Sequence, residues 1–394
     1  MIVVEIVFWV CAGLIVYTHV GYPLVLLALV RLRRVPIGER PGMADAGARP
    51  GPPPTLSGRA RAEHMPAVSL IVPAYDEEGV IAAKVANALA LDYPRERLQI
   101  IVASDGSSDA TAERARAAGA DLVLELPPGG KVAALNAGAE QANGELLAFS
   151  DANSAWAPDA LLRLVEPFAD PTVGYACGQV RFAGEGGNLE GAYWRYEMAV
   201  REMESALGGV TAGNGAIYAV RRGAYLPLAP SGSHDLSFPF ELAKRGLRSL
   251  YVPWARAEEK MVPTLEGEFA RKRRMMAGLW DIVVAEGMLS PCGYSPLFAF
   301  ELASHRLLRY LSPALHLVVL AANVALLGHG WAYTATLVAQ LALIAAALLG
   351  RWLPLAPLRI ARYYVMTTAS IAAGLWDRWR HGAAGRWEKA EGTR

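Results

Sequence analysis

Cysteine is scarce in this sequence, with three residues among 394. Cys11, Cys177 and Cys292 are odd in number and far apart, and none has a partner at the spacing of a zinc site. This pattern argues against a disulfide framework and against a structural zinc site. It fits a reducing, cytosolic environment for the central part of the chain.

The chain also lacks a net charge of either sign. Its 38 Lys and Arg residues are balanced by 37 Asp and Glu residues, so the formal net charge is +1. Such a balance gives no indication of a nucleic-acid partner. The hydrophobic fraction of 53% is high for a soluble protein, and 394 residues leave room for a catalytic domain together with membrane segments.

Charges are nearly absent from the N-terminal segment. Residues 2–30 are apolar apart from one glutamate and a few mildly polar side chains. The run is longer than the apolar region of a secretory signal and no basic region precedes it, so we expect a retained transmembrane helix over residues 1–30. By the positive-inside rule the chain continues in the cytoplasm, because three arginines follow directly: Arg31, Arg33 and Arg34.

Proline and glycine dominate the next stretch. Residues 31–66 include Gly51-Pro52-Pro53-Pro54 and predict a cytoplasmic linker with little packed structure. Over residues 67–262, strand-like and helix-like segments alternate, which predicts an α/β domain with a largely parallel, doubly wound sheet. The expected strands are 68–72, 98–103, 121–126, 145–150 and 173–182. The expected helices are 79–91, 110–118, 131–141, 190–207 and 236–245.

The C-terminal third is apolar again. Residues 263–305 carry Arg271-Lys272-Arg273-Arg274 beside aromatic and Met side chains, which is typical of amphipathic helices at a membrane interface. Within residues 306–350 we expect two transmembrane helices, over 307–327 and 331–349.

The region 351–394 combines a hydrophobic segment over 354–376 with a basic tail. A full span there would place the tail outside, against the charge rule. We therefore expect an interfacial or re-entrant helix and a cytoplasmic tail.

Acidic residues follow several expected strands. Asp76 follows the first strand, Asp105 and Asp109 flank the turn after the second, and Asp151 with Asn153 follows the fourth. In open α/β sheets, ligands bind outside the carboxyl ends of the strands. A carboxylate and an amide oxygen could hold a hard cation there, and with it a diphosphate. Asp105 and Asp151 would repel each other unless a cation or the donors of a ligand lay between them.

A structural role stays open for each of these acids. An Asp after a strand is ordinarily the N-cap of the next helix, and Asp-x-Asn is also typical of an Asx turn. Asp235, within Ser233-His234-Asp235-Leu236, could likewise cap the helix expected over 236–245.

Six short motifs occur between residues 67 and 275. They are Val72-Pro-Ala-Tyr-Asp-Glu-Glu78, Ser104-Asp-Gly-Ser-Ser-Asp109, Gly129-Gly-Lys-Val-Ala-Ala-Leu-Asn136, Phe149-Ser-Asp-Ala-Asn153, Gly213-Asn-Gly-Ala-Ile-Tyr-Ala-Val-Arg-Arg222 and His234-Asp235. In this order they resemble the motifs of membrane-bound family 2 glycosyltransferases. The resemblance implies an α/β, GT-A (nucleotide-diphospho-sugar transferase, Rossmann-like) domain flanked by transmembrane helices. The flanking helices are also similar to those of bacterial hyaluronan, chitin and exopolysaccharide synthases.

The resemblance also implies roles for single residues. Asp235 takes the position of the general base, Lys131 approaches the diphosphate, and Asp151 with Asn153 takes the position of the metal ligands. The residues implied for the nucleotide-sugar pocket are Pro73, Ala74, Tyr75, Glu77 and Asp105, the last at the uracil base. Those implied for the acceptor or diphosphate side are Gly213, Asn214, His234, Arg271 and Arg274.

The chemistry requires these residue types. Inverting transfer displaces a nucleoside diphosphate from the anomeric carbon, so negative charge grows on the leaving phosphate. A divalent metal, Mg²⁺ or Mn²⁺, and basic side chains stabilise that charge. A carboxylate on the acceptor side accepts the proton of the attacking hydroxyl.

The sequence departs from the family pattern at two places. Asn153 replaces the second Asp of the metal-binding motif. Arg271-Lys-Arg-Arg-Met275 lacks the Gln and the Trp of the motif that processive relatives carry. The second departure argues against the synthesis of long chains.

The resulting hypothesis is an inverting hexosyltransferase. It would transfer a sugar from a nucleotide-sugar donor, a UDP-sugar, to a lipid-linked or cell-surface glycan acceptor in cell-envelope polysaccharide biosynthesis. We expect a multi-pass protein of the inner (plasma) membrane whose catalytic domain is cytoplasmic, with the lipid bilayer and other cell-envelope enzymes as partners. The alternatives are a processive polysaccharide synthase, a sugar-nucleotide pyrophosphorylase and a non-catalytic membrane scaffold.

Overall fold

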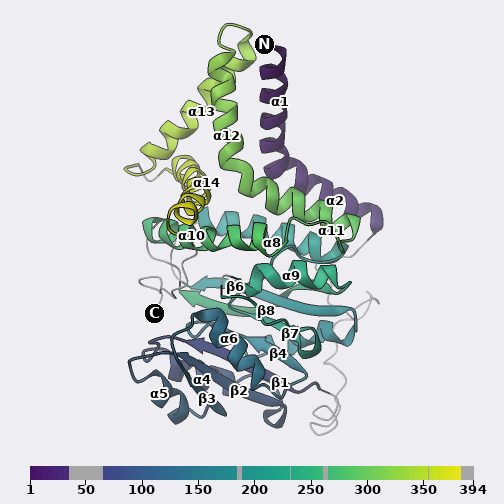
Figure 1. The fold of residues 1–394 in the computed structure, drawn as a ribbon, viewed down its shortest axis with the longest axis vertical. Helices are drawn as coiled ribbons and strands as arrows, with labels where there is room; N and C mark the ends of the chain where they lie inside the picture. The colour runs from purple at the N-terminus through teal and green to yellow at the C-terminus, as the bar shows by residue number, and fades with distance from the viewer. Residues whose placement is uncertain (35–64, 184–188, 231, 261–264, 354, 383–394) are drawn as a thin grey trace.

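The computed structural model describes residues 1–34, 65–183, 189–230, 232–260, 265–353 and 355–382 (Figure 1). Most of the linker expected over 31–66 and the end of the basic tail lie outside the described residues. Two regions are distinct in Figure 1: an α/β domain below, and a group of long helices above it.

An eight-stranded mixed sheet forms the α/β domain, in the order β3-β2-β1-β4-β7-β6-β8-β5. The strands β3, β2, β1 and β4 are mutually parallel, whereas β7 is antiparallel to both β4 and β6. In chain order the strands are β1 (Val68–Ala74), β2 (Leu98–Asp105), β3 (Leu122–Leu126), β4 (Leu146–Phe149), β5 (Ala155–Trp156), β6 (Val173–Ala183), β7 (Tyr218–Arg221) and β8 (Arg248–Lys260).

The α/β class and the parallel half of the sheet are thus confirmed. The sequence analysis did not predict β5, β7 or β8. Two of these strands have few residues, and β8 mixes polar and apolar side chains. Their pairing therefore depends on neighbours that are distant in the sequence.

The core lies on both faces of the central strands. Every residue of β1 is buried, which explains its nearly continuous apolar sequence. Leu70 and Val72 face one hydrophobic cluster, and Ile71 faces a second cluster with Leu135 and Phe149. The helices of this domain are α4 (Ile81–Leu89), α5 (Thr111–Ala117), α6 (Lys131–Glu140), α7 (Ala160–Val165) and α9 (His234–Lys244).

A layer of helices separates the sheet from the long apolar helices. It contains α8 (Leu189–Leu207), α10 (Leu265–Trp280) and α11 (Pro296–Glu301) (Figure 1). Above it lie α1 (Ile2–Val16), α2 (Tyr22–Arg33), α12 (Leu308–Ala325), α13 (Trp331–Leu349) and α14 (Ala356–His381). Turns of π-helix over 17–21 and 302–307 join α1 to α2 and α11 to α12.

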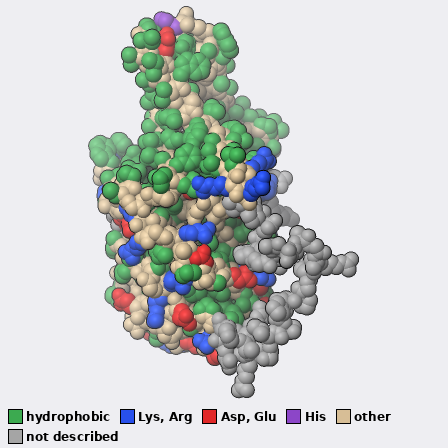
Figure 2. All heavy atoms as spheres, turned by 90° about the vertical axis from the view of Figure 1, so that its right-hand side faces the viewer, with side chains coloured by type: hydrophobic (Ala, Val, Ile, Leu, Met, Phe, Trp, Pro, Cys, Tyr) green, Lys and Arg blue, Asp and Glu red, His purple; other side chains and the backbone are tan. Residues whose placement is uncertain are grey.

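In the part of the chain that the structure describes, three helices are long and apolar enough to cross a membrane: Ile2–Arg33, Pro296–Ala325 and Trp331–Leu349. Many of their large hydrophobic side chains are exposed, such as Leu24, Leu317 and Val338. Figure 2 shows the same division on the surface, because hydrophobic side chains cover the upper part and most charged side chains lie lower. This distribution is the one that a lipid environment around the upper helices requires.

The last helix, α14, packs along α10. The Lys272 ammonium donates to the Tyr363 hydroxyl at 2.7 Å, and the Arg273 guanidinium pairs with the Asp377 carboxylate. At Gly374, an added Cβ would lie 2.6 Å from the Cβ of Met276 and 2.8 Å from the backbone nitrogen of Ala277. This helix is not among the three candidate spans of the described residues, and the interfacial placement expected for residues 354–376 stays a prediction.

We predict that Gly374→Ala destabilises the packing of α14 on α10. The added methyl group overlaps backbone atoms, and overpacking of this kind costs about 1–3 kcal/mol, more than the gain in helix propensity of about 1 kcal/mol. The melting temperature of the detergent-solubilised protein should fall.

The matched control is Gly13→Ala, because no atom lies within 4 Å of a Cβ at that helical glycine. Equal melting temperatures for the two variants would contradict the close packing at Gly374.

Candidate active site

An ion pair stands at the carboxyl edge of the sheet. Asp151 follows β4, and Lys131 is the first residue of α6. The Lys131 ammonium donates to the Asp151 carboxylate, and both side chains are about one-third exposed. Although burial lowers the pKa of Lys131, the carboxylate of Asp151 and, more weakly, that of Asp235 raise it above its ordinary value. A cation and an anion are therefore held at the position where α/β sheets bind ligands.

A second carboxylate fixes the start of α6. The Asp105 side chain, 4% exposed at the end of β2, accepts the N–H groups of Gly129 at 2.7 Å and Gly130 at 2.9 Å. The positive φ of Gly130, 90°, lets the chain turn there and enter the helix with Lys131. Asp105 and Asp151 thus have partners within the protein, so the expected repulsion between them does not by itself require a ligand.

The residues predicted for the nucleotide pocket lie at the end of β1 and in the turn after it. Pro73 and Ala74 are buried in the last positions of the strand. Tyr75 is half-buried, whereas the side chain of Glu77 is buried. These four residues are adjacent to the Asp105 edge because β1 and β2 pair in register, with Ala74 opposite Ser104.

Hydrogen bonds join this turn to the loop after β2. Asp76 has a φ of 47°, and its carboxylate accepts the N–H of Ser108 at 2.7 Å. The carboxylate of Asp109 accepts the N–H of Glu78 at 3.1 Å. Neither Asp is the N-cap residue of α4 or α5. The two acids instead hold the two strand-end loops together.

Asp235 lies in the first turn of α9, and its charge contributes to the raised pKa of Lys131. Its carboxylate accepts from the Ser233 hydroxyl, and its backbone carbonyl accepts the N–H of Gly213 at 2.6 Å. The N-cap residue of α9 is Ser233, so Asp235 is not the cap. Asn214, next to Gly213, is buried and accepts from Arg201 at 2.8 Å.

Three other predicted residues are His234, Arg271 and Arg274. His234 is buried with its ring against Phe149 and Phe238, and its Nδ1 is 2.8 Å from the Tyr218 hydroxyl. Burial, followed by the charge of Lys131, lowers the pKa of His234 to about 3, so the ring is neutral.

Arg271 and Arg274 lie on α10. Arg271 pairs with Glu268 on the same helix at 2.8 Å, and Arg274 is exposed. The structure therefore brings together Asp105, Lys131, Asp151 and Asp235, but not these two arginines.

Lys84, a buried lysine close enough to Asp151 to be affected by its charge, was not predicted from the sequence. Lys84 of α4 is 3% exposed, donates to the Ser154 carbonyl at 2.7 Å and lies 5.2 Å from the centre of the Trp156 ring. Burial lowers the pKa of Lys84 to about 7. Its spacing in the sequence could have indicated burial, because Lys84 falls on the apolar stripe of α4 with Ile81 and Ala88.

Among the described residues, no three His, Cys, Asp or Glu side chains group together as a metal site would require. Asp151 and Asn153 offer one carboxylate and one amide oxygen. Mg²⁺ is commonly bound by one or two carboxylates together with substrate phosphates and water. The oxygen donors therefore fit a divalent cation that arrives with a diphosphate.

Comparison with known proteins identifies the domain. Residues 69–225 match the family model described as "Glycosyl transferase family 2". A beta-monoglucosyldiacylglycerol synthase of Trichormus variabilis is 30% identical over 57% of this chain and 53% of its own length. An N-acetylglucosaminyltransferase of Rhizobium meliloti is 29% identical over 60% of this chain and 61% of its own length. The chain thus spans little more than half of the curated relatives it matches.

The fold has a solved counterpart. The mannosyltransferase PcManGT from Pyrobaculum calidifontis, in complex with GDP-Man and Mn²⁺, aligns with a TM-score of 0.68 at 24% identity. The alignment covers 95% of this chain and 99% of that protein. The arrangement of domain and helices is therefore shared along nearly the whole chain.

We predict that Asp105→Asn loosens the turn into α6. The amide would turn an N–H₂ group toward one of the two glycine N–H groups, and a buried hydrogen bond to a charged group contributes about 1.5–3 kcal/mol. Hydrogen exchange should accelerate over residues 127–135, and the melting temperature should fall. Asp159→Asn is the matched control, because Asp159 pairs with Arg163 at the surface. Unchanged exchange in the Asp105 variant would refute the role of its carboxylate.

Proposed function

Because residues 69–225 form a glycosyl transferase family 2 domain, we propose that the chain is an inverting glycosyltransferase that acts at a membrane. It transfers a sugar from a nucleotide-sugar to a lipid-linked or cell-surface glycan acceptor. The observation that carries the proposal is the Lys131–Asp151 pair at the carboxyl edge, with Asp235 in the first turn of α9 close enough to raise the pKa of Lys131.

The donor nucleotide binds along the ends of β1 and β2. Tyr75 and Glu77 line the ribose side, and Asp105 contacts the uracil base of a UDP-sugar. An ionised carboxylate has about four acceptor positions. Asp105 can therefore accept from the base while it holds Gly129 and Gly130.

The diphosphate lies between Lys131 and Asp151. Asp151 and Asn153 would hold a divalent cation, Mg²⁺ or Mn²⁺, which would supply positive charge to the leaving diphosphate. The Lys131 ammonium lies beside Asp151, within reach of phosphate oxygens bound at this edge. Lys131 then stabilises the charge that grows as the bond to the sugar breaks.

The acceptor hydroxyl approaches from the side of α9. Asp235 accepts its proton while the oxygen attacks the anomeric carbon, so the configuration at that carbon inverts. General-base catalysis of this kind contributes about 10²–10⁴-fold.

The acceptor is a lipid-linked or cell-surface glycan. Three apolar helices adjoin the domain, and the Trichormus variabilis relative is named for making a glucosyldiacylglycerol. Arg31, Arg33 and Arg34 at the end of α2 favour a cytoplasmic domain of a multi-pass inner-membrane protein. A ladder of long products from a labelled donor would instead support a processive synthase.

We predict that Asp235→Asn retains UDP binding and lowers kcat by about 10²–10⁴-fold, since the amide cannot accept the proton. The measurement is transfer of labelled sugar by membranes that contain the protein, together with UDP titration of the purified protein. Glu241→Gln on the same helix is the control and should keep full activity. Normal turnover by Asp235→Asn would exclude Asp235 as the base.

We predict that Asp151→Ala loses at least about tenfold in UDP affinity with Mg²⁺ or Mn²⁺, because the cation loses its carboxylate. Without a divalent cation, the affinity should stay equal or rise, because Lys131 is no longer paired. Isothermal titration with and without EDTA measures both. Asp159→Ala should behave like the unmodified protein in both conditions, and an unchanged cation effect in Asp151→Ala would remove the metal site.

A further inference from the structure

Helix α8 buries three ionisable side chains on one face. Glu197, Arg201 and Glu204 are spaced four and three residues apart, so they share one side of the helix. Glu204 is 0% exposed, and the other two side chains are buried as well. Burial of charge is costly unless each group is paired and hydrogen-bonded. The partners of these side chains therefore show which elements pack against this face of α8.

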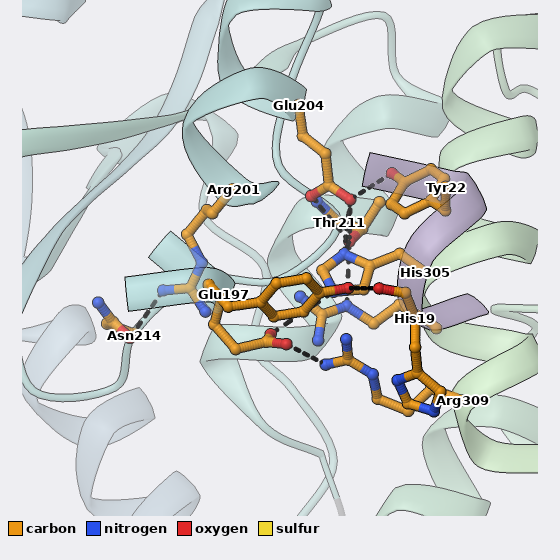
Figure 3. A network of polar contacts seen from close by, with 11 residues as sticks. His19, Tyr22, Glu197, Arg201, Glu204, Thr211, Asn214, His305 and Arg309 are labelled. Atoms are coloured by element: carbon orange, nitrogen blue, oxygen red, sulfur yellow. Dashed lines mark hydrogen bonds and ion pairs between the residues drawn. The ribbon is translucent and has the colours of Figure 1, made fainter. Parts of the chain in front are cut away.

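The partners of the two glutamates come from the apolar helices (Figure 3). The Glu204 carboxylate accepts from the Tyr22 hydroxyl of α2 at 2.6 Å and lies 2.6 Å from the His305 Nδ1. The Glu197 carboxylate pairs with the Arg309 guanidinium of α12 at 2.5 Å. Burial raises the pKa of Glu204, but the charges of His305 and Arg306 and the hydrogen bonds lower it to about 2. Both glutamates therefore act as anions that anchor α2 and α12 to α8.

The same network reaches the segment between α8 and β7 through Thr211. The Thr211 hydroxyl accepts from the Arg306 Nε at 3.0 Å and donates to the Glu204 carboxylate at 3.1 Å. Its backbone N–H also donates to Glu204, at 3.2 Å. Thr211 is completely buried, so these contacts fix both its side chain and its backbone.

Two residues further on, the segment holds Asp235. The N–H of Gly213 donates to the Asp235 carbonyl at 2.6 Å. A Cβ at Gly213 would lie 1.8 Å from the Tyr175 hydroxyl, so the segment has no room to shift toward the sheet. On the other side, Arg201 of α8 donates to the Asn214 amide oxygen at 2.8 Å.

We propose that Thr211 is a positioning residue for Asp235. Through Thr211, the position of the Asp235 carboxylate depends on how α2 and α12 pack against α8. The inference rests on the proposed function, in which Asp235 is the base. The path is short: Arg306 and Glu204 hold Thr211, Thr211 fixes Gly213, and Gly213 holds the carbonyl of Asp235. Among the described residues, the path makes no hydrogen bond to Lys131 or Asp151, although the charge of Asp235 acts on Lys131. We therefore expect the donor half of the site to change little when the path is interrupted.

The test uses the full-length protein in membranes or nanodiscs. Thr211→Val keeps the shape of the side chain and removes the hydroxyl, so kcat for transfer should fall by about tenfold to hundredfold. The KM for the donor and UDP affinity should stay within about twofold, because the donor half is unchanged. Thr211→Ser restores the hydroxyl and should recover most of kcat. Arg306→Lys removes the guanidinium donor and should lower kcat in the same way, which keeps the proposal testable if Thr211→Val folds poorly.

The matched control is Thr336→Val. The Thr336 hydroxyl donates to Asn323 at 2.8 Å between α13 and α12, so it also joins two apolar helices. It lies outside the path to Asp235, and its loss should leave kcat unchanged. If Thr211 had only a structural role, Thr211→Val and Thr336→Val would both be less stable than the unmodified protein. The folded fraction of each variant would then keep its normal kcat.

Hydrogen exchange separates this proposal from the proposed function. Thr211→Val should accelerate exchange over residues 208–215 and at the start of α9, but not over β1 to β4, whatever the enzyme transfers. No transfer by the unmodified protein with any nucleotide-sugar would overturn the proposed function, and the exchange would still report the coupling. Unchanged exchange at the start of α9, or a normal kcat in Thr211→Val and Arg306→Lys, would overturn the positioning role.

Discussion

The carboxyl edge of the sheet depends on one buried carboxylate. Asp105 accepts two backbone N–H groups in a place where unpaired amides would each cost about 1–3 kcal/mol. This interaction fixes the turn at Gly129 and Gly130, and that turn determines where α6 begins. Lys131 is the first residue of α6, and its ammonium reaches Asp151 at the end of β4, which is separated from β2 by β1. The Lys131–Asp151 pair thus depends on the hydrogen bonds that the buried Asp105 carboxylate accepts.

The acceptor half of the site is built in a different way. Asp235 is on α9. Its backbone carbonyl accepts a hydrogen bond from the segment between α8 and β7, and not from a parallel strand. That segment is bonded to residues of the apolar helices, foremost Arg306. Under the proposed function, therefore, the sheet would position the donor side, and the apolar helices, through α8, would position the side where the acceptor enters.

The sequence predicts the donor half far better than the acceptor half, for physical reasons. β1, β2 and β4 are buried on both faces, so their apolar runs and the acids after them can be recognised without a structure. The buried charges of α8 cannot, because Glu197, Arg201 and Glu204 look like an ordinary polar stripe until partners distant in sequence are known. Lys84 escaped prediction for the same reason, since its partners are a carbonyl and a ring about 70 residues away. Nor does the sequence reveal that His234, beside the predicted base, is buried with its ring bonded to Tyr218.

The contrast between the two halves also bears on the departures from the family motifs. Asn153 leaves one carboxylate at the cation position, where a partner lysine already neutralises Asp151. Under the proposed function, the cation would be held mainly together with a diphosphate, so metal binding and donor binding would be coupled. The basic run on α10 is engaged elsewhere, because Arg273 and Lys272 bind α14 and Arg271 binds Glu268. These residues join α10 to α14. Where processive relatives carry their motif, this chain therefore has side chains that pack two helices together.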